Sequence, residues 1–328
     1  MNRLLVLFGL AALGIVELLG FGAFTPAYAD ASVASVAMGG IRFRKEARIS
    51  MERERLWIST DQVRVEYEFV NQTNADIIVD LAFPMADAVC HPWKSVGPDS
   101  EVYNPDFQLW VEGTPQKYKT ETQALAGKRV YTALLGKLGI DIATCGHYQE
   151  GRTSDFSKLS KQDLRRLSAR GLVSPDGQVP LWTVRQVYYW TQTFPAGRTL
   201  HIKHVYKPGV GQSEQIVVNS LVSDWLDREA CLDPIVGRKL ALDIAGPAFE
   251  DASGYIYAWV DYTLKTGNNW QGPIKDFELN VEAPKDNGRW WVNFCWKGPI
   301  ERLGPGHVRV KASNLSPAQN LHILFLPD

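Results

Sequence analysis

The sequence has almost no net charge and few sulfur atoms. Its 328 residues include 35 basic and 36 acidic side chains, but only four cysteines and four methionines. A formal net charge of −1 excludes a global field that would attract nucleic acid. Hydrophobic residues make up 45% of the chain and charged residues 22%, which is ordinary for a globular protein and excludes a disordered chain.

Local motifs of the commonest active sites are also missing. The sequence contains no G-x-S-x-G elbow, no H-E-x-x-H motif, no phosphate-binding P-loop, no G-x-G-x-x-G and no EF-hand loop. We therefore expect no catalytic residues and no cofactor. A hydrolase that uses two carboxylates stays open as an alternative, because its residues need not be close in sequence.

Long hydrophobic runs are confined to the N-terminus. An apolar run at residues 4–24 is followed by Ala27 and Ala29, the small residues of a signal-peptidase site. We therefore expect residues 1–29 to be a signal peptide and the mature protein to be periplasmic or secreted, with no stable membrane insertion. An uncleaved anchor helix is the alternative, since the run is long enough to span a bilayer, but Glu17 interrupts it.

The four cysteines are an even set in a chain expected to be exported, which favours two disulfide bonds. None has the C-x-x-C spacing of a redox motif or a zinc ribbon. Three pairings are possible, and chain order suggests Cys90 with Cys145 and Cys231 with Cys295.

A metal site is the alternative use of the first two cysteines. His91 follows Cys90, and His147 lies two residues after Cys145, so two thiolates and two imidazoles could converge on zinc or copper. Because an oxidising compartment favours the disulfide, we expect no metal.

Stretches of alternating apolar and polar residues, separated by turn signals, predict a mainly β protein. Residues 63–70 have the pattern of a half-buried antiparallel strand, and a long aromatic strand at 182–194 precedes another at 199–206. In that last strand His201 and His204 would lie on opposite faces, since they are three residues apart. Further strands are expected at 77–83, 107–112, 116–120, 215–219, 255–264, 276–283, 290–296, 307–312 and 322–326.

Helical periodicity interrupts this β pattern. It is present at 128–138 and again at 160–171, where Ser160 is a good N-cap, Asp163 suits the first turn and Gly171 suits the end. We therefore expect two β-sandwich-like regions with a helical insertion between them: an N-terminal region at 30–120, the insertion at 121–176 and a C-terminal region at 177–328.

Aromatic residues are abundant, with 11 Trp, 12 Tyr and 13 Phe. Most would fill sandwich cores. The consecutive residues Tyr188, Tyr189 and Trp190 cannot all lie on one face of a strand, however, and Trp270 lies in a turn rich in Gly and Asn. Exposed aromatic patches are usually recognition surfaces, so we expect these four residues to bind a ligand.

Several stretches resemble one exported bacterial family when taken together. They are 39–41, 58–71 (ISTDQVRVEYEFVN), 82–84, 190–197 (WTQTFPAG), 204–208, 231–233, 266–274 (TGNNWQGPI) and 294–295. Their order and content are similar to those of the family catalogued as domain of unknown function 4424, over nearly the whole mature chain. The resemblance implies export and the Cys231–Cys295 pair, and it implies no activity.

These observations favour a disulfide-bonded, non-catalytic binding or assembly module of the bacterial cell envelope. Its partner would be an envelope protein or a glycan, bound through exposed aromatic residues, and not nucleic acid. One alternative is an envelope hydrolase or a metal-dependent enzyme that uses acidic or histidine residues, and another is a structural subunit of an envelope complex. Acidic residues are densest at Asp224, Asp227, Glu229 and Asp233, where oxygen ligands for calcium could gather.

Overall fold

The structure is a computed structural model that describes residues 32–37, 40–85, 87–90, 106–147, 154–212, 231, 257–285, 290–304 and 306–327. Within these residues the chain is mainly β, as the sequence predicts, and is organised in three sheets. No helix in this part of the chain is long and apolar enough to cross a bilayer.

The largest sheet has eight strands and presents the candidate site. Its central strands β15 and β3 run parallel, and each pairs antiparallel with its other neighbour. In spatial order the sheet contains β17 (Glu301–Gly304), β18 (His307–Leu315), β15 (Ile274–Glu282), β3 (Ile49–Ile58), β4 (Val63–Asn71), β12 (Thr199–Tyr206), β7 (Gln108–Val111) and β8 (Thr114–Pro115).

Two smaller sheets complete the β structure. The seven-stranded sheet contains β10 (Arg129–Val130), β9 (Lys119–Ala126), β11 (Thr183–Phe194), β5 (Ile77–Pro84), β1 (Ser32–Ala37) and β2 (Gly40–Arg44), with β6 (Ala88–Val89) also paired to β11. The four-stranded sheet contains β13 (Val210–Gln212), β14 (Ala258–Tyr262), β19 (Leu321–Pro327) and β16 (Trp290–Asn293).

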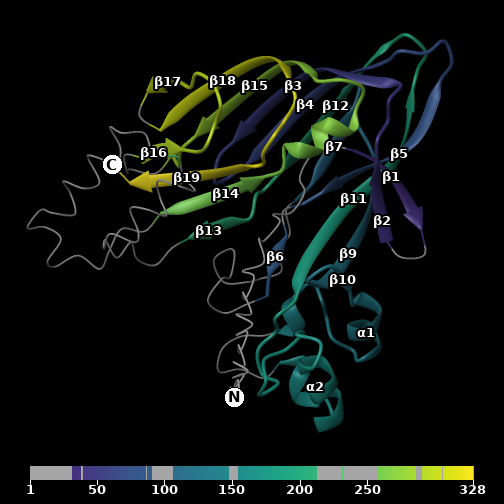
Figure 1. Cartoon of the computed structure of the whole chain (residues 1–328), viewed down its shortest axis with the longest axis vertical. Coiled ribbons are helices and arrows are strands. Elements are labelled where there is room, and N and C mark those ends of the chain that lie inside the picture. The colour runs from purple at the N-terminus through teal and green to yellow at the C-terminus, as the bar shows by residue number, and fades with distance from the viewer. Residues whose placement is uncertain are drawn as a thin grey trace, which may run out of the picture.

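One hydrophobic core joins the eight-stranded sheet to both other sheets. Phe69 of β4 lies edge-on to Phe194 of the seven-stranded sheet, with 5.8 Å between ring centroids. Tyr67, two residues earlier, brings its hydroxyl to 3.4 Å from that of Tyr262 in the four-stranded sheet. Because side chains alternate along a strand, these contacts leave Arg64, Glu66 and Glu68 on the outer face. Figure 1 shows the sheets layered in this way, with the helices of residues 132–168 at the lower end of the molecule.

The expected boundaries do not separate two sandwiches. Strands β3 and β4, from the expected N-terminal region, pair with β15 and β12 from the expected C-terminal region. Likewise β5 pairs with β11. The expected insertion at 121–176 also includes most of β9, which is a strand of the seven-stranded sheet. Local periodicity identifies strands, but their partners are set by contacts that are distant in sequence.

A helical lobe follows β10. Its two α-helices lie within the segments 128–138 and 160–171, where helical periodicity predicts them. It contains α1 (Thr132–Lys137), η1 (Cys145–His147), η2 (Asp155–Lys158) and α2 (Lys161–Ser168). Ser160 caps α2, and its Oγ accepts a hydrogen bond from the Asp163 amide at 3.1 Å. Leu135 and Phe156 of the lobe pack with Trp182 in a second, smaller hydrophobic core. Strand β11 connects the lobe to the sheets (Figure 1). A further short helix, η4 (Lys265–Asn269), precedes Trp270.

Candidate functional site

The outer face of the eight-stranded sheet carries charged residues in register across several strands. His201, Glu68, Arg53 and Asp276 are successive cross-strand partners from β12 to β15. Two residues along each strand, a second row aligns in the same order: Lys203, Glu66, Arg55 and Glu278. Charges of opposite sign therefore alternate across the sheet.

The first row is closely ion-paired at its centre. Arg53 Nη1 lies 2.5 Å from Glu68 Oε1, and Arg53 Nε lies 3.2 Å from Asp276 Oδ2. Arg55 reaches across from the second row to the same Asp276 oxygen at 2.5 Å. The hydrogen bonds from Arg55 and Arg53 hold the pKa of Asp276 below its usual range. The carboxylate of Asp276 in turn raises the pKa of Arg53.

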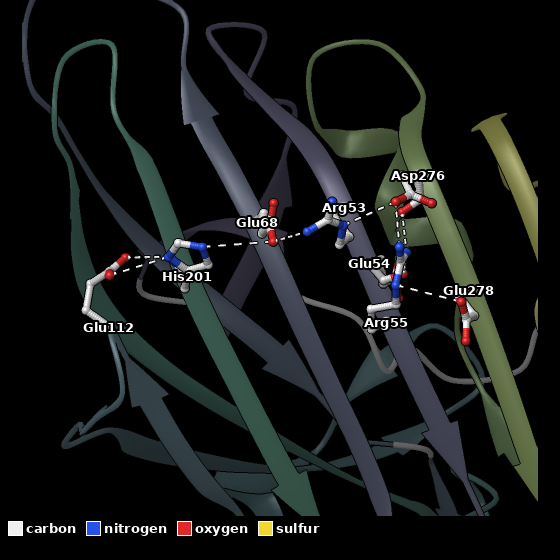
Figure 2. Close-up of polar contacts among 8 residues, drawn as sticks. All are labelled: Arg53, Glu54, Arg55, Glu68, Glu112, His201, Asp276 and Glu278. Atoms are coloured by element: carbon white, nitrogen blue, oxygen red, sulfur yellow. Dashed lines mark hydrogen bonds and ion pairs between the residues drawn. The ribbon is translucent and has the colours of Figure 1, made fainter.

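His201 joins this row to the turn between β7 and β8. Its Nδ1 lies 3.2 Å from Glu112 Oε1, and its Nε2 lies 3.9 Å from Glu68 Oε1. The backbone amide of His201 donates a further hydrogen bond to Glu112 at 2.6 Å. Figure 2 shows the resulting chain of contacts, which runs from Glu112 through β12, β4 and β3 to Asp276 and Glu278 on β15.

The second row is paired much more loosely. Glu66 lies between Lys203 and Arg55 in the register, yet the ion pair it forms is with Arg64 Nε, at 3.8 Å. The Lys203 ammonium lies 5.0 Å from the centre of the Trp110 ring, within the range of a cation–π contact. Lys203 and Arg55, which flank Glu66 in the register, therefore contact Trp110 and Asp276 instead of Glu66.

A cavity of about 470 Å³ opens above this part of the face, between β7, β12, β4 and β3. It is large enough for a small molecule. His201 contributes to its lining, and the charged and aromatic residues around it are Arg53, Arg55, Glu66, Tyr67, Glu68, Trp110 and Lys203. The Tyr67 side chain itself is buried in the core, so Trp110 is the aromatic residue that is half-exposed there. The cavity thus combines charges of both signs with one aromatic wall, which suits binding of a polar ligand.

Three of the four aromatic residues expected to bind a ligand lie in the core, so the expectation that they are exposed is wrong. Tyr188, Trp190 and Trp270 are only 6%, 5% and 4% exposed. Tyr188 stacks on Phe107 at 4.2 Å, and Trp270 lies 4.4 Å from Phe69. The physical reason is that β11 is an interior strand whose inner face is covered by the eight-stranded sheet.

Tyr189 does point to the opposite face of β11 from Tyr188 and Trp190, as the alternation requires. It is half-buried there and packs against Ala82 and Val187. Three consecutive aromatic residues are therefore divided between two faces, and neither face presents them as an exposed patch.

His201 and His204 lie on opposite faces of β12, as predicted. His201 is exposed among the carboxylates described above. His204 is fully buried, and neither of its ring nitrogens has a hydrogen-bond partner in the described structure. Burial lowers the pKa of His204 to about 3, so its imidazole is neutral at physiological pH.

Both disulfides form with the pairing that chain order suggests, Cys90 with Cys145 and Cys231 with Cys295. Thiolate ligation by the first pair is therefore excluded in this state. His147 contacts Asp155 at 3.2 Å, while His91 and the acidic group at 224–233 lie outside the described residues. Among the described residues, no group of three or more His, Cys, Asp or Glu side chains could hold a metal ion.

Sequence reasoning missed most of the residues that line the cavity. The alternation of Arg64, Glu66 and Glu68 was visible as a polar strand face. No local sequence pattern showed that the strands of Arg53 and Lys203 would flank β4, because these strands are far apart in the sequence.

The fold and the site together define a disulfide-bonded, mainly β protein with a charged cavity of ligand size on one sheet. The chain belongs to the family described as "Domain of unknown function (DUF4424)", whose model matches residues 29–324. No curated protein matches the chain.

Among solved structures, the chain is similar to a Legionella pneumophila protein that is described provisionally as a nutrient binding protein. The two share 15% sequence identity, and the match covers 92% of this chain and 72% of that chain with a TM-score of 0.42. A similarity at this level carries no argument about function.

Proposed function

We propose that this protein is an exported, non-catalytic binding module of the bacterial cell envelope, and that its ligand occupies the cavity on the eight-stranded sheet. The observation that carries the proposal is the composition of the cavity lining. Arginine and lysine cations alternate there with glutamate carboxylates beside the Trp110 indole. A ligand-sized hollow with a few convergent polar groups and an aromatic wall is typical of small-molecule sites.

The ionisation of Asp276, which pairs with two residues of the cavity lining, supports binding over catalysis. A general acid needs a carboxyl group whose pKa is raised towards neutrality. Arg55 and Arg53, which line the cavity, have the opposite effect on their partner Asp276, since they lower its pKa. The described residues that line the cavity also include no serine, threonine or cysteine that could act as a nucleophile.

Two features support export. Disulfides such as Cys90–Cys145 and Cys231–Cys295 persist in oxidising compartments, of which the bacterial periplasm is one. The apolar run at 4–24, followed by Ala27 and Ala29, has the pattern of a secretory signal. Cell fractionation and the intact mass of the exported protein test this part. We expect the loss of residues 1–29 and, on reduction, a gain of two hydrogens for each disulfide.

Binding is tested by NMR on the exported protein, with the tryptophan indoles labelled with ¹⁵N and the Trp110 signal assigned through Trp110→Phe. Dipeptides and soluble glycan fragments are the probes. We expect one probe class to shift the Trp110 indole signal, and Arg55→Gln combined with Lys203→Gln to abolish that shift. Lys311→Met is the matched control, since Lys311 lies on the same face outside the cavity and contacts Glu278 at 3.8 Å.

Two results would overturn the proposal. One is a probe that the protein converts chemically, which would indicate an enzyme. The other is the absence of any shift of the Trp110 signal with both probe classes, or a shift that persists in the Arg55 and Lys203 double variant.

A further inference from the structure

We infer that the ligand of the cavity is a small zwitterion of the amino-acid or short-peptide type, an inference that rests on the proposed binding function. Its carboxylate would lie at Lys203 and its ammonium at Glu66. These two residues are direct cross-strand partners on β12 and β4, and both line the cavity.

Lys203 is a cation available to a ligand carboxylate. Among the described residues no carboxylate forms an ion pair with it, and its Nζ has the Trp110 ring as its neighbour at 5.0 Å. The other cations that line the cavity are engaged. Arg53 bonds Glu68 at 2.5 Å, and Arg55 bonds the side chain and the backbone carbonyl of Asp276 at 2.5 and 3.1 Å.

Glu66 is the matching anion. Its contact with Arg64 is long, at 3.8 Å between Nε and Oε1. The guanidinium of Arg64 lies over the Trp57 ring at 3.7 Å, and Trp57 belongs to β3, on the opposite side of β4 from Lys203. Glu66 is therefore flanked by cations without a short hydrogen bond to any of them in the described structure, and it can accept bonds from an ammonium group.

The spacing of the two residues fits a zwitterion. Directly opposed residues of an antiparallel pair have Cβ atoms about 4.5–5.5 Å apart, so Lys203 and Glu66 present a cation and an anion side by side. The ammonium and carboxylate of an amino acid are also close together. Trp110 is the cross-strand partner of Lys203 on its other side and supplies an apolar wall for a side chain or a second residue.

The surrounding charges disfavour other classes of ligand. A dianion would meet the carboxylates of Glu66 and Glu68 within the same cavity. A neutral saccharide would use the Trp110 ring, leaving Lys203 without a charged partner and Glu66 with only its long contact to Arg64. The neighbouring row has no such opening, because His201, Glu68, Arg53 and Asp276 already contact one another.

The inference is tested by calorimetric titration of the exported protein with free L-amino acids and dipeptides. The tightest probe is then repeated as its N-acetyl and its C-terminal amide derivative. We expect each derivative to bind at least about tenfold more weakly, because each removes one charge-assisted contact. Lys203→Met should weaken binding of the unmodified probe by a similar factor, and so should Glu66→Gln.

The pattern across the variants separates ligand class from protein folding. Lys203→Met should bind the amide derivative as well as the wild type does, and Glu66→Gln should show the same equality for the N-acetyl derivative. Lys311→Met should bind the unmodified probe within about twofold of wild type. Thermal unfolding of each variant verifies that it is folded.

Failure of the inference differs from failure of the proposed function. A neutral glycan fragment whose binding in the cavity depends on Trp110 and Arg55, but not on Lys203 or Glu66, overturns the zwitterion and leaves the binding function intact. Equal binding of the blocked and unblocked probes overturns it in the same way. If neither peptides nor glycans bind the cavity, both the inference and the proposed function are overturned.

Discussion

The imidazole of His204 lies edge-on to the ring of Phe83, with 4.8 Å between their centroids and an interplanar angle of 73°. Three further rings surround it: Phe107 at 5.2 Å, Trp190 at 5.4 Å and Tyr67 at 5.6 Å. A titratable group is thus enclosed by aromatic side chains at the junction of two sheets. Burial of this kind strongly disfavours the charged form.

The first prediction concerns the acid stability that follows from this enclosure. The pKa of His204 is about 3 in the folded protein, against 6.5 for an ordinary histidine. Below pH 6.5 the unfolded chain therefore takes up a proton that the folded protein does not, and stability falls with pH until it levels off near pH 3. His204→Leu should remove this dependence. When the pH is lowered from 7 to 4, the free energy of unfolding of the variant should therefore rise by about 3 kcal/mol relative to that of the wild type.

Urea denaturation at pH 7 and pH 4 measures this difference. His201→Leu is the matched control, because the imidazole of His201 is exposed on the other face of the same strand. Equal acid sensitivity of the His204→Leu variant and the wild type would contradict the prediction.

The second prediction separates core aromatic residues from the one in the cavity. Trp190→Ala should lower the free energy of unfolding by about 3–5 kcal/mol, because it leaves a large hole in the core. Trp110→Ala should lower it by less than about 1 kcal/mol, since Trp110 is half-buried on the outer face. Denaturant titration of both variants gives the comparison. Near-equal losses of stability would contradict the assignment of Trp190 to the core.

The third prediction concerns the Cys90–Cys145 disulfide, which joins the helical lobe to the sandwich across 55 residues of sequence. Replacing both cysteines by serine should destabilise the lobe by about 2–4 kcal/mol, since the unfolded chain regains the entropy of the open loop. Limited proteolysis should then cut between 131 and 182 before it cuts the sandwich. Replacement of Cys231 and Cys295 is the control, and it should leave the lobe as protected as in the wild type.

The fourth prediction concerns Asp276, which receives hydrogen bonds from Arg53 and Arg55. Asp276→Asn should destabilise the fold only slightly at pH 7, by about 0.5 kcal/mol, because the pair is half-exposed and screened by solvent. The pKa of Asp276 is lowered, so its contribution is present above pH 3.8 and is lost as the pH falls through its folded pKa. Chemical denaturation at pH 7 and pH 2 tests this, and a difference that persists undiminished at pH 2 would contradict it.

Local patterns predicted much of the β structure and one helix. The strand expected at 199–206 is β12, and the alternation at 63–70 is β4, one residue longer. Ser160 caps α2 as expected, although the helix ends at Ser168, before Gly171. These elements were predictable because hydrophobic periodicity and capping depend on residues only a few positions apart.

Strand β3 was not predicted, and the reason is visible in its side chains. Its register shifts between Met51 and Arg53, so Ser50 and Met51 are both buried and the alternation is broken at its start. Further along, Glu54 faces the core and its Oε1 accepts a hydrogen bond from the Tyr262 hydroxyl at 3.4 Å. A buried carboxylate stabilised by a distant tyrosine has no signature in the local pattern.

The order of the amino acids was enough to show which residues share a face of a regular strand, since side chains alternate with a period of two. It also supplied four cysteines in an order that matches their pairing. The neighbours of each strand are set by the folded chain, which places Arg53 beside Asp276 across 223 residues of sequence. It likewise decided that the rings of Tyr188 and Trp190 are covered. The physical reason is that strand pairing and burial depend on long-range contacts between sheets, which a period read along the chain does not contain.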